Sequence, residues 1–106
     1  MNTYGSIRSF VLRAGRMTDA QQRDYENLSS KWCIPFSQSH INYSDIFANT
    51  ENVVVEIGFG MGQATACIAE ANPETNYLGI EVHRPGIGRL LGEINKRSLS
   101  NLFIIE

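Results

Sequence analysis

Apolar and polar positions in the second half of the chain predict three strands that alternate with two helices. The first strand spans Val53–Ile57, where a β-branched run is typical of a strand buried on both faces. Further strands are predicted at Tyr77–Val82 and Leu102–Ile105. Strand–helix–strand–helix–strand order with right-handed crossovers is half of a doubly wound parallel sheet. We therefore expect an α/β protein that carries the first three strands of such a sheet.

Both segments between the strands show the spacing of amphipathic helices. One helix is predicted over Gln63–Ala71, and Asn72–Pro73 ends it. The other begins at Pro85–Gly86, because proline is tolerated in the first helical turn. Apolar residues recur at i, i+3, i+4 and i+7 in each helix and form one stripe. These are Ala64, Cys67, Ile68 and Ala71 in the first helix and Ile87, Leu90, Leu91 and Ile94 in the second.

The N-terminal region has weaker patterning but contains one clear helix signal. Thr18 with Gln21 three residues later resembles a capping box, so a helix is predicted from Asp19 to about Ser30. Trp32 follows in an apolar, non-periodic link, and we expect it to pack against the sheet domain.

An arginine-bearing arm precedes this helix. Arg8, Arg13 and Arg16 all come before the first acidic residue of the chain. Arginine pairs well with phosphate oxygens, so the arm is a candidate contact for nucleic acid. A solvated tail is the alternative interpretation.

Three glycines at alternate positions join the first predicted strand to the first predicted helix. Gly58, Gly60 and Gly62 would let the backbone approach a nucleotide, and the helix N-terminus would offer unpaired N–H groups. Glu56 precedes them and would repel a pyrophosphate, and Gln63 stands where a dinucleotide motif has glycine or alanine. The pattern favours a cationic ligand without phosphate, such as S-adenosylmethionine. The alternative is a tight turn with a solvated glutamate.

A second acid closes the second predicted strand. Glu81 lies about 20 residues past the glycine turn, where an acid accepts hydrogen bonds from ribose hydroxyls in related folds. Glu56 and Glu81 would then face one crevice, although Glu81 could also be a charged strand terminus. His83 and Arg84 follow directly and would lie at the mouth of that crevice.

Composition changes this interpretation little. The 106 residues allow one small domain or a piece of a larger one, divided into an arm, helix and connecting segment at 1–52 and a sheet region at 53–106. The net charge of −2 does not indicate nucleic-acid binding, and no apolar run approaches the ~20 residues of a membrane span. Cys33 and Cys67 have no metal-ligand spacing, which favours reduced thiols in a cytoplasmic protein.

Two motifs resemble the bacterial tRNA (guanine-N7-)-methyltransferase family. They are E-I-G-F-G-M-G at Glu56–Gly62 and G-I-E-V-H-R-P-G at Gly79–Gly86, and the combination is specific. The arm is similar to the N-terminal segment of that family, and the likeness runs from about Ile7 to the end. It is weakest over residues 31–52.

The resemblance implies a Rossmann-like class I enzyme that transfers a methyl group from S-adenosylmethionine to N7 of a guanine in the tRNA variable loop. Glu56, Glu81 and the three glycines match the cofactor-binding positions of the family, and His83 is a further candidate contact. Arg84 joins the arm arginines as a candidate tRNA contact. No metal is implied.

The chain departs from that family in its length. It ends at Glu106, near the third strand, whereas the family continues with further cofactor-binding, catalytic and tRNA-binding segments. We therefore expect an N-terminal fragment with no catalytic residue of its own and little activity. The first strand would remain an open hydrophobic edge that invites self-association, whereas the full-length form would be a monomer. Alternatives are a non-catalytic module that binds S-adenosylmethionine or tRNA, and an NAD-binding half-domain.

Overall fold

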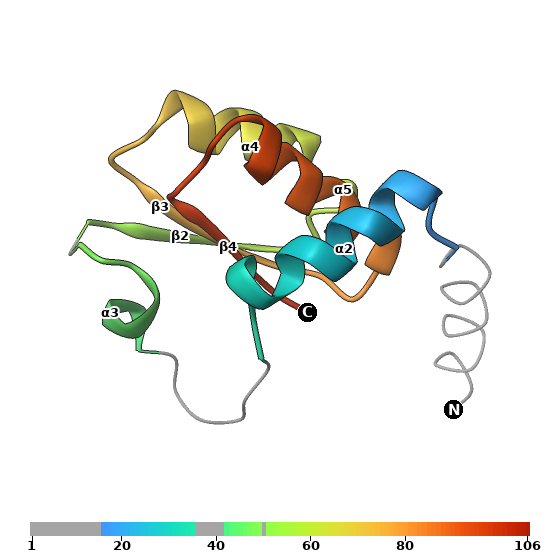
Figure 1. The fold of residues 1–106 in the computed structure, drawn as a ribbon. Coiled ribbons are helices and arrows are strands. Elements are labelled where there is room, and N and C mark those ends of the chain that lie inside the picture. Colours follow the sequence, from blue (N-terminus) through green and yellow to red (C-terminus); the bar gives the residue numbers. More distant parts are fainter. Residues whose placement is uncertain (1–15, 36–41, 50) are drawn as a thin grey trace, which may run out of the picture.

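The computed structural model describes residues 16–35, 42–49 and 51–106, and within these ranges it contains a parallel sheet with the helices at residues 63–71 and 84–96 on one face (Figure 1). The order of the strands is β1-β4-β3-β2, and every neighbouring pair is parallel. The strands are β1 (Cys33–Ile34), β2 (Val53–Ile57), β3 (Asn76–Ile80) and β4 (Leu102–Ile105). The helices are α2 (Asp19–Trp32), α3 (Tyr43–Ile46), α4 (Gln63–Ala71) and α5 (Arg84–Lys96). The α/β fold class is confirmed.

The predicted bounds of β2, α4 and β4 are confirmed, whereas β3 begins one residue earlier and ends two residues earlier than predicted. The early end has a local cause. The backbone N–H groups of Val82 and His83 donate to Oε2 of Glu81, at 3.0 and 3.1 Å. These two N–H groups therefore hydrogen-bond to Glu81 of their own segment, and the strand ends before them. Val82 is 71% exposed.

Strand β1 was missed by the sequence analysis, which expected three strands. Cys33 aligns with Ile104 and Ile34 with Ile105, so β1 extends the sheet beside β4. The capping box of α2 is confirmed by reciprocal hydrogen bonds of 2.9 and 3.1 Å between Thr18 and Gln21. The helix continues two residues beyond the predicted end, to Trp32.

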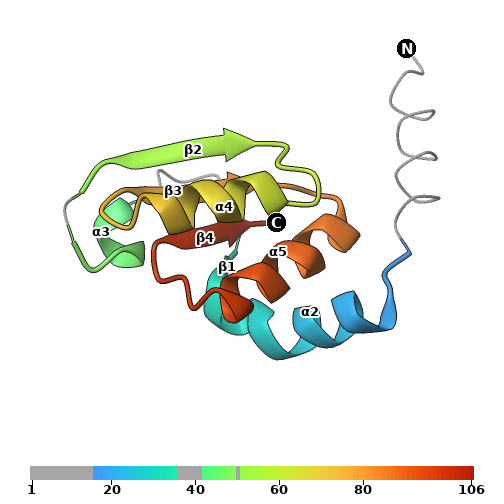
Figure 2. The ribbon, with the colours of Figure 1, turned by 90° about the horizontal axis from the view of Figure 1, so that it is seen from above.

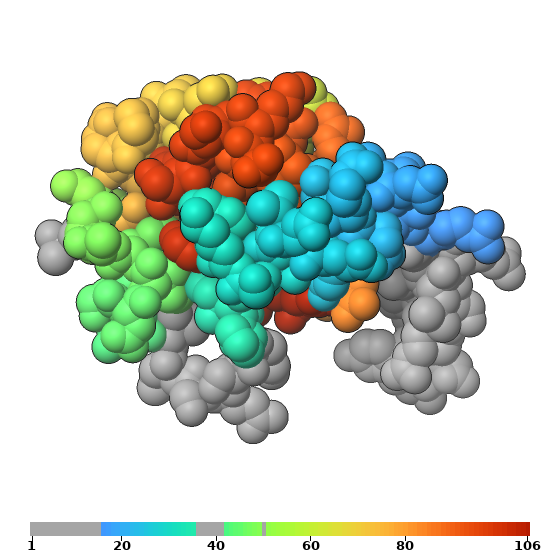
Figure 3. Space-filling model, viewed as in Figure 1, coloured from blue at the N-terminus to red at the C-terminus, as the bar shows by residue number. Residues whose placement is uncertain are grey.

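The hydrophobic core lies between the sheet and α5. The predicted apolar stripe of α5 is confirmed, because Ile87, Leu90, Leu91 and Ile94 are fully buried. Leu102 and Ile104 of β4 complete the same cluster. Burial of each such side chain contributes about 1.5–3 kcal/mol to folding. Helix α2 lies directly against α5 on the face shown in Figure 3.

An aromatic cluster forms around β4. The ring of Trp32 lies 5.1 Å from that of Phe103, and the ring of Phe47 lies 5.3 Å from it on an edge-to-face contact. The expectation that Trp32 packs against the sheet domain is confirmed. None of the helices in the described ranges combines the length and apolar character needed to cross a membrane.

The opposite edge of the sheet is open. Figure 2 shows β2 as the outermost strand, and no described strand lies beyond it. Val54 is 46% exposed and Ile57 is 79% exposed, so the prediction that this strand is buried on both faces is wrong for the described residues. Among the described residues, β2 pairs with β3 alone. A β-branched run indicates a strand but not the presence of neighbours on both sides.

Helix α4 buries a different stripe from the one that its apolar spacing indicated. Its buried residues are Thr65, Ala66 and Ala69, whereas Ile68 of the predicted stripe is 50% exposed. Ile68 faces a hollow over β2, where no described element covers it. The remaining residues of the predicted stripe, Ala64, Cys67 and Ala71, are also exposed.

Candidate functional site

The glycine turn between β2 and α4 has a backbone that side-chain-bearing residues rarely adopt. Gly58, Gly60 and Gly62 have φ values of +76°, +66° and +77°, in the left-handed region that glycine occupies without steric cost. The N–H of Gly58 donates to the carbonyl of Ile80 at 2.7 Å, and that of Gly62 donates to the carbonyl of Phe59 at 3.1 Å. The turn is thereby fastened to the end of β3.

The first turn of α5 presses against this glycine turn. A β-carbon at Gly86 would lie 1.8 Å from the carbonyl oxygen of Gly60, far inside any real contact. Gly86 therefore permits the two segments to touch. The motif at Glu56–Gly62 and the motif at Gly79–Gly86, distant in sequence, form one structural unit.

Glu81 is the acid that ties this unit together. Its Oε1 accepts a 2.8 Å hydrogen bond from the N–H of Gly60, while Oε2 accepts from the N–H groups of Val82 and His83. Hydrogen bonds to a charged group are worth about 1.5–3 kcal/mol each. The side chain is half-buried, at the carboxyl end of β3. This is the end of a parallel sheet at which ligands bind.

Glu56 lies on the neighbouring strand, β2, and its side chain is bonded to a residue of helix α4. It aligns with Gly79 of β3, and its Oε1 accepts a hydrogen bond from the hydroxyl of Thr65 in α4. Glu56 borders a hollow of about 410 Å³, and Glu81 is not among the residues that line it. The lining consists of Val54, Val55, Glu56, Ile57, Thr65, Ile68 and Tyr77.

Thr65 is a site residue that sequence reasoning missed. It is 4% exposed and lies in the first turn of α4, three residues after the last glycine of the turn. A hydroxyl at that spacing, facing back toward the strand that carries an acid, is the signal that could have identified it.

The charges at this end of the sheet suit a cation better than a phosphate. Two carboxylates flank the turn, and the segment Glu56–Gln63 carries no basic side chain. A pyrophosphate would meet negative charge here, whereas an ammonium or sulfonium would meet attraction. The described ranges hold no group of three or more His, Cys, Asp or Glu side chains placed to hold a metal ion.

Comparisons with known proteins identify the family of this chain. A family profile described as a putative methyltransferase matches residues 50–106, more than half of the chain and the whole of the unit formed by the two motifs. The chain belongs to this methyltransferase family.

Several curated proteins of one name are also similar to this chain. The chain is 46% identical over 101 residues to a tRNA (guanine-N(7)-)-methyltransferase of Francisella tularensis subsp. novicida, which covers 94% of this chain and 44% of that protein. A protein of the same name from Nitrosomonas europaea is 46% identical over 105 residues, covering 99% and 47%. One from Treponema pallidum (strain Nichols) is 43% identical over 126 residues, covering 94% and 50%. The chain thus spans about half the length of the curated relatives it matches.

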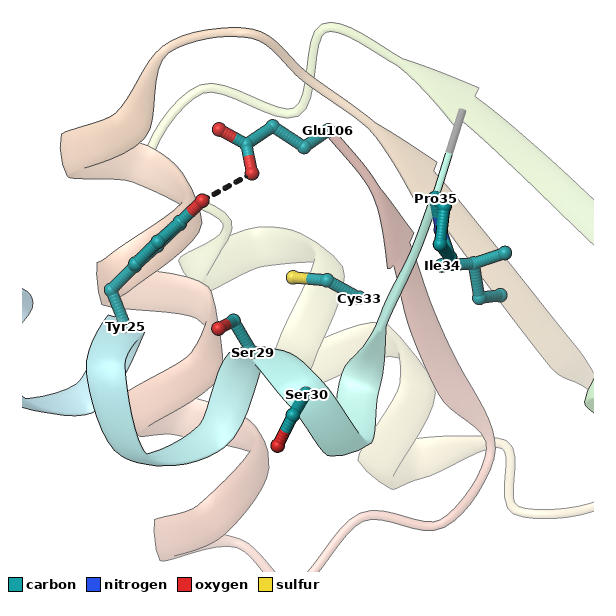
Figure 4. A pocket seen from close by; sticks show the side chains of 7 residues that line it. All are labelled: Tyr25, Ser29, Ser30, Cys33, Ile34, Pro35 and Glu106. Atoms are coloured by element: carbon teal, nitrogen blue, oxygen red, sulfur yellow. Dashed lines mark hydrogen bonds between the residues drawn. The ribbon is translucent and has the colours of Figure 1, made fainter. Parts of the chain in front are cut away.

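Arg84, which lies within the second motif, contacts two other side chains. Its Nε donates to Oε2 of Glu106 at 2.6 Å, and its guanidinium lies 4.8 Å from the centre of the Tyr25 ring. The hydroxyl of Tyr25 donates to Oε1 of the same Glu106 (Figure 4). The hydrogen bond to Glu106 raises the pKa of Arg84. His83 is the N-cap residue of α5, and its carbonyl accepts from the N–H of Ile87 at 3.1 Å.

Tyr25 and Glu106 border a hollow of about 310 Å³ between α2 and β1, drawn in Figure 4. Burial, the hydrogen bond to Glu106 and its charge raise the pKa of Tyr25 to about 12. Burial, followed by the charge of Glu106, raises the pKa of Cys33 to about 11, so this thiol is protonated at neutral pH. Neither Tyr25 nor Glu106 was a sequence candidate.

The candidate nucleic-acid contacts divide into two groups. Arg8 and Arg13 lie outside the described residues. Arg16 is exposed immediately before α2, and Arg84 is exposed at the start of α5. The structure thus describes two of the four arginines, and Arg84 is the one with an ion-pair partner.

Proposed function

We propose that this chain is the cofactor-binding part of a tRNA (guanine-N7-)-methyltransferase. The complete enzyme would transfer the methyl group of S-adenosylmethionine to N7 of a guanine in the variable loop of tRNA. The names of the relatives support the reaction, and one observation supports the site. That observation is the glycine turn with Glu56 on one side and Glu81 bonded to Gly60 on the other.

In this proposal the two acids hold opposite parts of the cofactor. Glu56 attracts the positively charged amino acid end, and Glu81 accepts hydrogen bonds from the ribose hydroxyls. The glycines keep side chains away from the ligand, and His83 borders the same site. When bound, the cofactor supplies an electrophilic methyl group on its sulfonium sulfur.

The residues of this chain act by positioning. N7 of guanine carries a lone pair, so methyl transfer needs no strong base, and alignment of the two reactants supplies most of the acceleration. We assign no catalytic residue within this chain. Arg8, Arg13, Arg16 and Arg84 are proposed contacts to tRNA phosphates, and Arg84 would exchange Glu106 for phosphate. A cytoplasmic location follows from the tRNA substrate.

Calorimetric titration with S-adenosylhomocysteine tests the cofactor site. We expect Glu81→Gln to weaken binding at least tenfold, because about 1.5–3 kcal/mol is lost when a charged hydrogen-bonding partner is removed. Glu74→Gln is the matched control: it removes the same charge from an exposed turn residue before β3 and should leave affinity unchanged. Equal affinity in wild type and Glu81→Gln would refute the site, and binding of NADH instead would favour the dinucleotide alternative.

A separate assay distinguishes an enzyme part from a binding module. We expect the 106-residue chain to transfer little or no labelled methyl group to unmodified tRNA. Robust turnover would contradict the absence of a catalytic residue. Binding of S-adenosylhomocysteine without turnover is the expected result, and binding of neither cofactor nor tRNA would refute both proposals.

A further inference from the structure

A threonine in the first turn of α4 makes a hydrogen bond that its own helix does not require. Thr65 is 4% exposed, and its hydroxyl donates to Oε1 of Glu56, nine residues earlier on β2. Threonine side chains in helices commonly donate to a backbone carbonyl three or four residues back. A hydroxyl has a single proton to donate. In Thr65 that proton goes to a carboxylate on the preceding strand.

The bond between Thr65 and Glu56 spans the glycine turn. Glu56 lies two residues before the first glycine, and Thr65 lies three residues after the last one. The N-cap residue Gly62 gives α4 no side-chain bond, and the first turn of the helix has no acidic side chain. Glu56 therefore supplies the negative charge that a helix N-terminus favours. Attachment of α4 to β2 is one consequence of this bond, and orientation of the Glu56 carboxylate is another.

Burial of the Thr65 hydroxyl makes the orientation of Glu56 persistent. A buried hydroxyl without a partner is costly, so Thr65 keeps the carboxylate as its acceptor. A free glutamate side chain would lose rotational freedom when a ligand fixed it, and that loss weakens binding. A carboxylate that is already ordered avoids much of this cost. Oε1 accepts from Thr65, which leaves Oε2 to accept from a ligand.

We propose that Thr65 is a positioning residue of the cofactor site, which orders the Glu56 carboxylate for the ammonium group of S-adenosylmethionine. This role rests on the proposed function, because Thr65 does not contact the ligand itself and acts only through Glu56. Thr65 should therefore affect ligands that carry the amino acid end and should not affect ligands that lack it.

Two substitutions separate the hydroxyl of Thr65 from the rest of the side chain. Thr65→Val removes the donor and keeps the branched shape, whereas Thr65→Ser keeps the donor and removes a methyl group. If the bond only attached α4 to β2, its loss would disturb the glycine turn and weaken every ligand of the site alike. If the bond orders Glu56, the loss is confined to ligands with an ammonium group.

Calorimetric titration with two probes measures this difference. S-adenosylhomocysteine carries the amino acid end, and 5′-methylthioadenosine has the same nucleoside and a thioether without it. We expect Thr65→Val to weaken S-adenosylhomocysteine about threefold to tenfold. Its affinity for methylthioadenosine should be unchanged, which also shows that the variant is folded. Thr65→Ser should restore most of the affinity. Thr75→Val, which removes a hydroxyl immediately before β3, is the matched control and should alter neither affinity.

A double-mutant cycle tests whether Thr65 acts through Glu56. In a Glu56→Ala background, Thr65→Val should have no further effect on the affinity for S-adenosylhomocysteine. Unchanged affinity in Thr65→Val, equal losses for the two probes or additive effects in the cycle would each overturn the proposal. Failure of the wild-type chain to bind S-adenosylhomocysteine would instead refute the proposed function, and the role of Thr65 with it.

Discussion

The half of the sheet around β4 and the half around β2 are built from similar sequence patterns, but their side chains differ in burial. β4 and α5 form a closed side, where α5 buries eight of its residues and α2 packs against it. β2 and α4 form an open side, where α4 buries three residues and most of β2 is exposed. Each side combines an apolar strand with a helix whose apolar residues recur at helical spacing. The number of neighbours, and not the composition, decides which side becomes core.

A bridge of charged side chains joins the two sides at the end of α5. Nε of Arg97, the C-cap residue of α5, donates to Glu93 at 2.8 Å, and another nitrogen of Arg97 donates to Glu70 of α4 at 2.6 Å. Arg89 lies 3.4 Å from the second oxygen of Glu93. These contacts hold the pKa of Glu93 below its usual value.

The largest expected effect contrasts truncation on the two sides. Leu90→Ala should lower the free energy of unfolding by about 2–5 kcal/mol, because it leaves a cavity in a fully packed cluster. Ile68→Ala, on the open side, should cost less than about 1.5 kcal/mol, because half of that side chain already contacts solvent. Urea denaturation monitored by circular dichroism measures both variants. Equal losses would show that the open side is packed in solution.

The charged bridge should make stability depend on pH. Since the folded pKa of Glu93 is lowered, its contribution is present above the unfolded value of about 4.3 and is lost as pH falls through the folded value. Glu93→Gln should lower the free energy of unfolding at pH 7 by about 1.5–3 kcal/mol. It should also make the free energy of unfolding fall less steeply as pH decreases. Glu74→Gln serves again as the control, and a profile of unchanged slope in Glu93→Gln would contradict this role.

The smallest effect is expected where α2 meets the end of β4. Tyr25→Phe removes the hydroxyl that donates to Glu106 and should cost about 0.5–1.5 kcal/mol. Because the folded pKa of Tyr25 is raised to about 12, its contribution is complete below the unfolded value of about 10 and is lost as pH rises toward 12. Thermal unfolding of both proteins at pH 8 and pH 11 measures this. If wild type and Tyr25→Phe differed in stability by the same amount at pH 8 and at pH 11, Tyr25 would not be a cause of the loss of stability at alkaline pH.

Particular elements show how far sequence reasoning reached. The bounds of β2, α4 and β4 and the capping box of α2 follow from local patterns, and the structure confirms them. Strand β1 could not be found in this way, because two residues are too short to show a period. The buried stripe of α4 was also missed, because helical spacing identifies an apolar face without identifying what covers it.

Some features of the candidate site could likewise be predicted from the sequence, and others could not. Glu56, Glu81 and the glycines could be named from their positions in the sequence, since each lies at a strand end or in a turn. Only the folded chain brings Gly60 to Glu81, Thr65 to Glu56, and Tyr25 and Arg84 to Glu106.

The sequence by itself therefore determined the elements, the order in which they alternate and the charge around the glycine turn. These properties depend on residues within a few positions of one another, where backbone preferences and side-chain period act directly. The tertiary structure decided which faces are buried and which side chains meet. Those outcomes depend on neighbours distant in sequence, because burial and hydrogen bonding are satisfied by whatever segment the fold brings into reach.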